Sequence, residues 1–401
     1  MSSRALDEAL ARLPELRRRF DITRVCETTR LDRACVPMMS AIVPNSPDDV
    51  SVYNGRGRTR DEALVGAVME AVERQTAARC ELAQRTMRPD AIEGGLDLRA
   101  AGLRSGYAGV EMPFVRGLDV ANGETVFVPT ALVQMPWRGL PAFATTHTNG
   151  LAAAFSKIDA IRRALLELLE RHLWALTHAG AHLRPKRILR ASLRCDLAFV
   201  DDPVDELVLP CGDERVDDLA LRIRAAGLTL RVVVMRAHGL PLAMCATVRE
   251  SETGIERAHT GLGAAWCPAD AAVRAITEAM QARVADTQAA RENILRAGDE
   301  RGSFSEHTRR GRAPAYGRWY FDGPTSPVDL GALEDSSGPD IAGETRRLIA
   351  AVKRLAARIV VVDLSPPDGG YAVVRAIVPE LETTLIDGRI GSLAKHVVAG
   401  A

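Results

Sequence analysis

Several features that would place this chain in a simple class are missing from its sequence. Lys and Arg together number 52, as do Asp and Glu, so the formal net charge is zero. This balance argues against a partner held by bulk electrostatics, such as nucleic acid or a membrane surface. No apolar run approaches the length of a membrane span. The 401 residues suffice for a sizeable core, as one large domain or as two to three fused lobes.

Lysine and paired cysteines are also scarce. Only Lys157, Lys186, Lys353 and Lys395 occur, and the rest of the Lys and Arg total is Arg. Arg grips phosphates and carboxylates bidentately, although a GC-rich genome would produce the same bias. The seven cysteines are odd in number, and none lies in a C-x-x-C pair or at zinc-finger spacing. We therefore expect a reduced, cytoplasmic protein without a disulfide framework.

The N-terminal stretch 1–20 reads as a short, charged amphipathic helix. It lacks the apolar core of a signal peptide, and Asp7, Glu8 and Glu15 argue against an organelle transit peptide. This reading agrees with a cytoplasmic location.

Helix and strand patterns then alternate and predict a mixed α/β (α+β) fold, although they do not predict the strand order. The sequence T-R-D-E predicts a helix that starts near Thr59, with Glu62 three residues later. Residues Gly302–Pro339 are rich in Gly, Pro, Ser and charge, which predicts an extended connection or a mobile loop. We expect this segment to be a mobile cover over the functional site that becomes ordered when a ligand binds. The other expected elements are helices over 157–178, 269–291 and 343–358 and strands over 36–43, 125–128, 228–235, 242–248, 359–364 and 371–378.

The pattern E-x-x-E-R occurs twice, each time in an expected helix after a glycine-containing loop. The two copies consist of Glu70, Glu73 and Arg74 and of Glu167, Glu170 and Arg171. A spacing of i, i+3 places both carboxylates on one helix face, where they can reach one cation. Mg²⁺ suits such a pair, because it binds one or two carboxylates together with waters and phosphate oxygens.

A single E-x-x-E-R is more often a solvated ladder of ion pairs on a helix surface. The neighbouring residues argue against that interpretation here. Apolar residues surround the second pair on most of the helix circumference, and Glu70 and Arg74 lie at the edge of an apolar arc. Carboxylates in such surroundings are costly unless they pair or bind metal. Two such helices in one chain favour a functional site.

Two further segments carry weaker signals. The loop 51–59 ends at a helix N-terminus, which is a natural anion site, but its G-x-G is neither a Walker loop nor a dinucleotide fingerprint. Glu278, Gln281 and Arg283 form a polar cluster on an Ala-rich helix. Taken alone, this cluster is typical of a solvated face.

Taken together, these segments resemble the YcaO family of ATP-dependent enzymes. The segments 23–46 and 54–74 are similar to the opening strand, glycine loop and first metal-binding helix of that family. The segments 148–172, 261–291 and 360–382 are similar to its second helix, its Glu/Gln/Arg helix and its C-terminal strand pair. The resemblance implies a YcaO-like fold with an ATP and Mg²⁺ site between helices and without a P-loop. It also implies a helical extension over 1–20, a YcaO domain over 21–390 and a tail over 391–401.

The resemblance implies a role for individual residues as well. It implies that Mg²⁺ is held by Glu70, Glu73, Glu167 and Glu170. Contacts with ATP or with these carboxylates are implied for Arg56, Arg74, Asn149, Arg171, Glu278, Gln281 and Arg283. Three positions depart from the family pattern, with Gly66 in place of a Ser, Arg56 in place of a Lys and His172 in place of an Asp. Arg56 keeps the charge with a different geometry, and His172 is expected to be a packed, hydrogen-bonded histidine.

The activity that the resemblance implies is O-phosphorylation of a backbone amide in a ribosomal peptide or protein. The segment 23–46 is similar to members that work beside a TfuA partner, which favours thioamide formation, and azoline formation at Cys, Ser or Thr is the close alternative. A homodimer is also implied. Two other classes stay open, namely a non-catalytic ATP-binding accessory protein and a metal-dependent hydrolase that needs no nucleotide.

Overall fold

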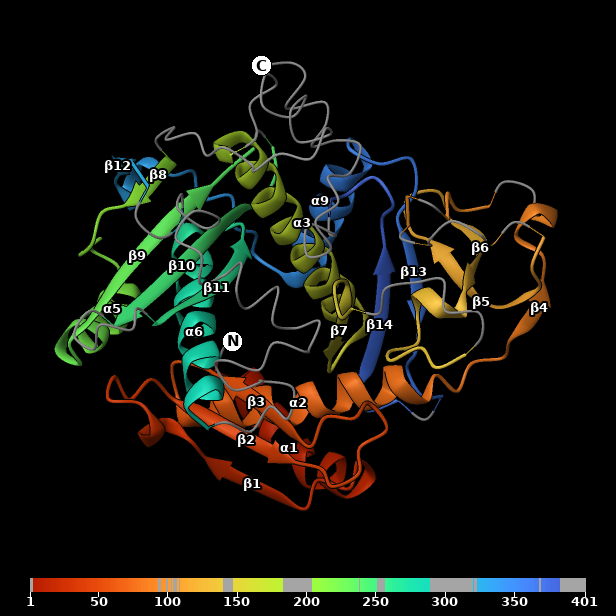
Figure 1. Cartoon of the computed structure of the whole chain (residues 1–401), viewed down its shortest axis with the longest axis horizontal. Helices are drawn as coiled ribbons and strands as arrows, with labels where there is room; N and C mark the ends of the chain where they lie inside the picture. The colour runs from red at the N-terminus through yellow and green to blue at the C-terminus, as the bar shows by residue number, and fades with distance from the viewer. Residues whose placement is uncertain are drawn as a thin grey trace, which may run out of the picture.

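The computed structural model describes residues 3–382, apart from 93–94, 99, 102, 104–106, 108, 140–146, 183–203, 238, 251–256, 289–319, 321–322 and 368. Over these residues the chain forms three β-sheets with helices packed between and around them, so the predicted mixed α/β fold is confirmed (Figure 1). None of the helices in this part of the chain combines the length and the apolar composition of a membrane crossing.

The strands are β1 Arg24–Glu27, β2 Met38–Ile42, β3 Val52–Arg56, β4 Arg85–Met87, β5 Met112–Asp119, β6 Glu124–Pro129, β7 Leu151–Ala154, β8 Val204–Leu207, β9 Leu228–Met235, β10 Leu242–Glu250, β11 Arg257–Ala265, β12 Thr325–Val328, β13 Val360–Asp363 and β14 Ala372–Ile377. The helices are α1 Ser3–Arg19, α2 Arg60–Arg79, α3 Lys157–His182, α5 Glu214–Ala225, α6 Pro268–Gln288 and α9 Ile341–Lys353. The sheets have the strand orders β1-β2-β3, β11-β10-β9-β8-β12 and β4-β5-β13-β14-β7, with β6 paired to β5. Their pairings are antiparallel except for the parallel pair β8–β12.

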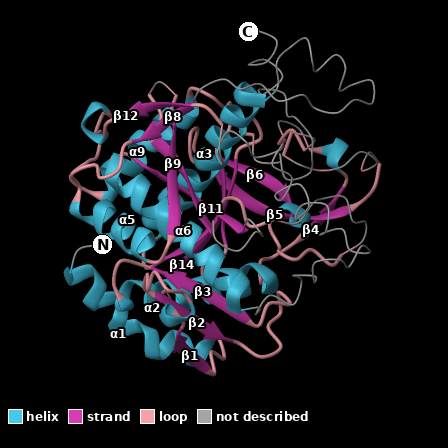
Figure 2. Cartoon of the chain, turned by 60° about the vertical axis from the view of Figure 1, so that its left-hand side comes forward, coloured by secondary structure: helices cyan, strands magenta, loops and turns pink. Residues whose placement is uncertain are grey.

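Three strand–helix units organise the molecule. The strand β3 leads into α2, β7 into α3 and β11 into α6, and each of these strands is an end strand of its sheet. Each helix packs on its own strand and also on the strand of another unit, because α2 contacts β7, α3 contacts β11 and α6 contacts β3. The three units therefore close into a ring, with α2, α3 and α6 around the middle of the molecule (Figure 1 and Figure 2).

Glycines allow two of these strands to lie directly on their helices. A Cβ atom on Gly55 in β3 would come within 2.0 Å of the Ala67 amide nitrogen in α2. A Cβ atom on Gly261 in β11 would come within 2.1 Å of the Ala279 amide nitrogen in α6. Any larger residue would push the strand away from the helix, so glycine sets how closely strand and helix approach at both places.

The start of α2 follows the prediction. The Thr59 hydroxyl accepts the Glu62 backbone N–H at 3.1 Å, and the Glu62 carboxylate accepts the Arg58 backbone N–H at 2.9 Å. These bonds satisfy donors that the first turn of a helix leaves free. They fix the start of the helix that carries Glu70 and Glu73.

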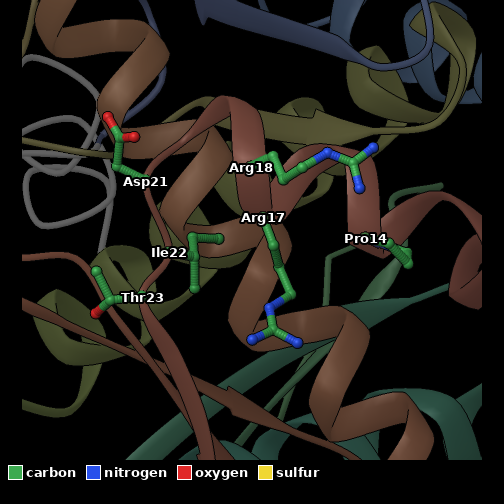
Figure 3. Close-up of a pocket in the computed structure, with 6 residues that line it drawn as sticks. All are labelled: Pro14, Arg17, Arg18, Asp21, Ile22 and Thr23. Carbon is green, nitrogen blue, oxygen red and sulfur yellow. The ribbon is translucent and has the colours of Figure 1, made fainter.

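The helix expected at the N-terminus is present as α1. It buries Ala9, Leu13 and Leu16 in the same hydrophobic core as α2, β5 and β14. A surface hollow lies at its C-terminal end, as Figure 3 shows, and is lined by Pro14, Arg17, Arg18, Asp21, Ile22 and Thr23. No residue expected to bind ATP or Mg²⁺ lines this hollow.

Most predicted elements are observed with small shifts at their ends. One expectation is wrong in part, because Thr325–Val328 within the expected loop Gly302–Pro339 forms β12 and Leu333 is buried. Within that expected loop, 302–319 and 321–322 lie outside the described residues, as does the tail 391–401. The sequence also did not predict β11, because its glycines pack on α6 in place of apolar side chains.

Candidate active site

The candidate residues lie at equivalent positions of the three units. Each unit has a two-residue sequence that ends in Gly and lies in its strand or directly before it. These sequences are Asn54-Gly55, Asn149-Gly150 and Thr260-Gly261. We aligned the three units on these pairs; the connection before α2 is shorter by two residues than the other two. In this alignment one equivalent position holds Glu70, Glu167 and Glu278, and another holds Glu73, Glu170 and Gln281. The repeat is therefore threefold. The sequence pattern E-x-x-E-R revealed only two copies, because the third has lost the second carboxylate and the Arg that follows it.

Two of the glutamates accept backbone N–H groups at the start of the second unit. Glu73 Oε2 accepts the Ala153 N–H at 2.9 Å, and Glu167 Oε2 accepts the Gly150 N–H at 3.1 Å. Gly150 has a φ of +78°, and a Cβ atom there would lie 2.4 Å from the Ala376 carbonyl oxygen, so only glycine fits. These bonds direct carboxylates of α2 and α3 toward the same segment of chain.

The guanidinium of Arg74 is fixed by a fully buried carboxylate. Arg74 Nε donates to Asp48 Oδ2 at 2.7 Å, and the Asp48 side chain has no exposed surface. The other Asp48 oxygen accepts bonds from the Ser46 and Tyr53 hydroxyls. Asp48 thereby holds the guanidinium of Arg74 in place. Burial raises the pKa of Glu70, and the positive charge of Arg74 offsets part of that increase.

Glu278 connects all three units. Its Oε2 accepts Arg56 Nη2 at 2.7 Å, and its Oε1 lies 3.6 Å from Arg171 Nη2. The same Arg171 nitrogen lies 3.7 Å from Glu170 Oε1 and 4.0 Å from Glu167 Oε1. The side chains of Arg56, Arg171 and Glu278 remain between 25% and 31% exposed, so this junction is open to a ligand.

Gln281 completes the link between α6 and β3. Its side-chain oxygen accepts Arg56 Nη1, and its side-chain nitrogen donates to the Asn54 carbonyl oxygen. Arg56, the departure from the family lysine, thus contacts both polar residues of α6 at once. A lysine offers a single ammonium nitrogen and lacks the two spaced nitrogens of the planar guanidinium that make this contact.

Burial raises the pKa of the four glutamates in the two E-x-x-E-R copies, Glu70, Glu73, Glu167 and Glu170. It raises the pKa of Glu167 to about 7 and that of Glu170 to about 8, against the opposing charge of Arg171. The pKa of Glu73 is raised further by the charges of Glu70 and Glu167. Carboxylates on separate helices therefore act on one another, and they form one charge cluster.

This donor set fits Mg²⁺ together with a nucleotide. Within the described ranges no group of three His, Cys, Asp or Glu side chains is placed to hold a metal ion alone. Mg²⁺ needs only one or two protein carboxylates when phosphate oxygens and waters complete its shell. Crowded carboxylates with raised pKa values gain from a nearby cation, and Arg56 and Arg171 suit phosphate oxygens.

Three of the predicted residues lie in other surroundings. Arg283 Nε donates to Asp32 Oδ2 at 2.6 Å with both side chains buried, which ties α6 to the segment before β2. Its contact with ATP stays a prediction. Asn149 is buried next to Gly150, whose backbone N–H donates to Glu167. His172 is 1% exposed, its Nδ1 accepts the Glu382 N–H at 3.0 Å, and burial lowers its pKa to about 4, so it is the packed neutral histidine that was expected.

The sequence did not point to three charged residues of this region. Asp48 lies in a stretch that reads as a turn, so no signal identified it. Arg375 on β14 is buried and Arg274 on α6 is half-buried, and burial lowers the pKa of each to about 10. Arg375 had a signal, because it is the single charge in the buried run 371–378.

Comparisons with known proteins identify the family of the chain. The family model described as YcaO cyclodehydratase, ATP- and Mg²⁺-binding, matches residues 54–382. An uncharacterized protein from Methanothermobacter thermautotrophicus is 30% identical over 375 residues, which cover 91% of each chain. An uncharacterized protein in the tfuA 3′ region of Rhizobium leguminosarum bv. trifolii is 30% identical over 408 residues, which cover 96% of this chain and 90% of that protein.

A solved structure shows the same fold. The YcaO from Methanopyrus kandleri bound with AMPPCP and Mg²⁺ superposes with a TM-score of 0.67 at 23% identity, covering 97% of this chain and 93% of that one. The family model spans most of the present chain, and the two relatives are similar along nearly all of it. The chain belongs to the YcaO family of ATP- and Mg²⁺-binding cyclodehydratases.

Proposed function

We propose that this chain uses ATP and Mg²⁺ to phosphorylate the oxygen of a backbone amide in a ribosomal peptide or protein, and that the product is a thioamide. The observation that carries the proposal is the charge cluster in which Arg56 and Arg171 pair with glutamates of α3 and α6, while the charge of Arg56 also acts on Glu70 of α2. Phosphoryl transfer requires positioned phosphates and neutralised charge more than covalent catalysis. A cluster of carboxylates and arginines supplies these two requirements.

The proposed reaction starts from an unreactive amide. Hydrosulfide adds to the carbonyl carbon, and the oxygen that becomes anionic attacks the γ-phosphorus of ATP and releases ADP. The carbon–oxygen bond then breaks, so the amide oxygen leaves in the phosphate and a C=S bond remains. The hydrogen of hydrosulfide ends on the phosphate, and the sum is amide, hydrosulfide and ATP to thioamide, ADP and hydrogen phosphate.

The roles of individual residues follow from their contacts. Glu70, Glu73, Glu167 and Glu170 would hold Mg²⁺, which neutralises phosphate charge when it is bound. Arg56 and Arg171 would turn from Glu278 to the phosphate oxygens, because a guanidinium binds phosphate as well as carboxylate. Asp48 would keep Arg74 in place during this exchange.

A thioamide product and a TfuA-like partner are supported by the relative that is encoded in a tfuA 3′ region. The segment 23–46, which resembles TfuA-associated members, points the same way. We infer that the enzyme acts in the cytoplasm as a homodimer. Azoline formation, in which a Cys, Ser or Thr side chain adds to the amide in place of hydrosulfide, is the second candidate, because the family model is described as a cyclodehydratase.

The test is reconstitution with ATP, Mg²⁺, sulfide and a precursor peptide encoded beside the gene, with and without a TfuA-like protein. Exchange of oxygen for sulfur raises the mass of the peptide, whereas ring formation removes water, so mass spectrometry separates the two products. Nucleotide binding without any change in the peptide would support an accessory protein. Turnover without nucleotide would support a plain hydrolase and contradict the proposal.

A further inference from the structure

Arg375 is a buried cation on the side of β14 that faces α2. Val373 and Ile377 lie on the same side of the strand as Arg375, and both belong to the hydrophobic core shared with α2. Val374, on the other side, belongs to the core that includes α3. Arg375 is only 5% exposed and lies opposite Leu151 in the pairing of β14 with β7. A charge placed between a sheet and a helix in this way is costly unless something compensates it.

Protein groups satisfy only part of the Arg375 guanidinium. Nε donates to the Leu132 carbonyl oxygen at 3.1 Å, and Nη2 lies 3.5 Å from His147 Nδ1. Nη1 is buried and has no hydrogen-bond partner in the described part of the chain. A buried guanidinium nitrogen without an acceptor indicates a place that an oxygen atom is suited to fill.

Two half-buried carboxylates lie near Arg375 without pairing with it. The charges of Glu167 and Glu73 act on its guanidinium, yet among the described residues neither carboxylate is within ion-pair distance of it. One oxygen of each is already bonded to the chain around β7, through the N–H groups of Gly150 and Ala153. Opposite charges that act on one another and yet do not pair leave room for a group that bridges them.

We propose that Arg375 binds an oxygen of the terminal phosphoryl group of ATP, on the β14 side of the glutamates that hold Mg²⁺. This assignment rests on the proposed function. A phosphoryl oxygen would accept the free Nη1 donor, and its negative charge would separate the guanidinium from the Mg²⁺ at Glu73 and Glu167. Arg suits this role because its planar donors match phosphate geometry, whereas Lys offers only a point charge.

The test measures nucleotide binding and not turnover. Calorimetric titration of Arg375→Met with AMPPCP and Mg²⁺ should show an affinity roughly 10- to 100-fold below that of the unmodified protein, which corresponds to one lost charge-assisted hydrogen bond. Binding of ADP and Mg²⁺ should be unchanged, because ADP lacks the terminal phosphoryl group. Arg375→Lys should bind AMPPCP with an affinity between those of Arg375→Met and the unmodified protein. Arg116→Met, at an exposed position of β5 in the same sheet, should bind both nucleotides normally.

Several results would overturn the assignment. An equal loss for AMPPCP and ADP would show that Arg375 only supports the glutamates, and unchanged binding of both would show a purely structural charge. If Arg375→Met does not fold, Arg375→Lys decides, since it should weaken AMPPCP binding selectively, and normal AMPPCP binding would contradict the assignment. An unmodified protein that binds neither nucleotide would defeat the proposed function as well, whereas normal binding that is insensitive to Arg375 would defeat this inference alone.

Discussion

The chemistry proposed for this protein depends on the carboxylates of four glutamates. Burial disfavours the ionised forms of Glu70, Glu73, Glu167 and Glu170, and repulsion among them adds to the effect, while arginines offset only part of it. Such an arrangement costs stability in the absence of a ligand. It becomes favourable once a divalent cation is bound, which is how a metal site differs from a structural network of ion pairs.

Replacing one carboxylate should separate stability from function. Glu73→Gln and Glu170→Gln should each lower nucleotide-dependent modification of the peptide by about 10²-fold or more, because the charge that holds Mg²⁺ is lost. The melting temperature without metal should stay equal or rise, because the crowding of charge is relieved. Glu81→Gln, at an exposed position after α2, serves as the control and should change neither quantity. Wild-type turnover in both cluster variants would refute the metal assignment.

The raised pKa values also predict how stability depends on pH. Glu167 and Glu170 have an ordinary pKa of 4.5 and folded values of about 7 and about 8, so the folded state binds more protons than the unfolded state between these limits. The free energy of unfolding of the ligand-free protein should therefore fall as the pH rises from 4.5 through about 7 and about 8.

Melting curves across this pH interval provide the measurement. Glu170→Gln should flatten the upper part of the slope, and saturating Mg²⁺ with AMPPCP should flatten all of it, since a cation favours the ionised carboxylates. A melting temperature of the ligand-free protein that rises with pH, and that Glu170→Gln leaves unaltered, would contradict the raised pKa values.

Sequence reasoning reached some residues of the site and not others, for a physical reason. The apolar neighbours of Glu167 and Glu170 lie on the same helix, so local periodicity shows that these glutamates are not solvated. Asp48 acquires its role only because the fold brings it to Arg74, 26 positions away. The role of Glu278 as a junction depends in the same way on Arg56, which is 222 positions away. Interactions of this range leave no local pattern.

Among the elements, the strand–helix contacts at glycine are the most constrained part of the scaffold. The Cβ atom of an alanine at position 55 would overlap the backbone of α2, so β3 would have to move, and Arg56 with it. Gly55→Ala should destabilise the protein by about 2 kcal/mol or more. It should also weaken nucleotide binding, because Arg56 would lose its place beside Glu278 and Gln281.

Gly331→Ala is the matched control for this prediction. Its Cβ atom would meet no atom within 4 Å, and its backbone is not in the left-handed region. Denaturant unfolding and calorimetric titration of the two variants should therefore differ sharply. Equal stability of both variants would mean that β3 does not lie on α2 as described.

Some elements with strong local signals were predicted, although α5 with its Asp213 cap was not. The capping residues at Thr59 and Glu62 gave the start of α2, and the continuous apolar runs gave β9 and β10. The strand β11 and the short strand β12 escaped prediction, because their place in the sheet depends on a helix and on β8, which are remote in the sequence. Local propensity cannot report such partners.

On the scale of the whole molecule, the site is a product of the ring of three units. No single unit contains it, because each helix contributes its polar residues to a space that the strand of another unit also borders. The mixed α/β class and the resemblance to the YcaO family followed from the sequence, but the ring did not. Its closure is set by which end strand each helix covers, and the sequence contains no record of strand order.

The central claim is that ATP activates the amide oxygen itself, and an isotope label tests it most directly. A substrate peptide labelled with ¹⁸O at the modified carbonyl should release labelled inorganic phosphate, one per modification, together with ADP. This result is expected because the carbonyl oxygen becomes the phosphoryl acceptor at the cluster of glutamates and arginines. Unlabelled phosphate, formed while the peptide gains sulfur or a ring, would show that ATP acts on another partner and would contradict the account.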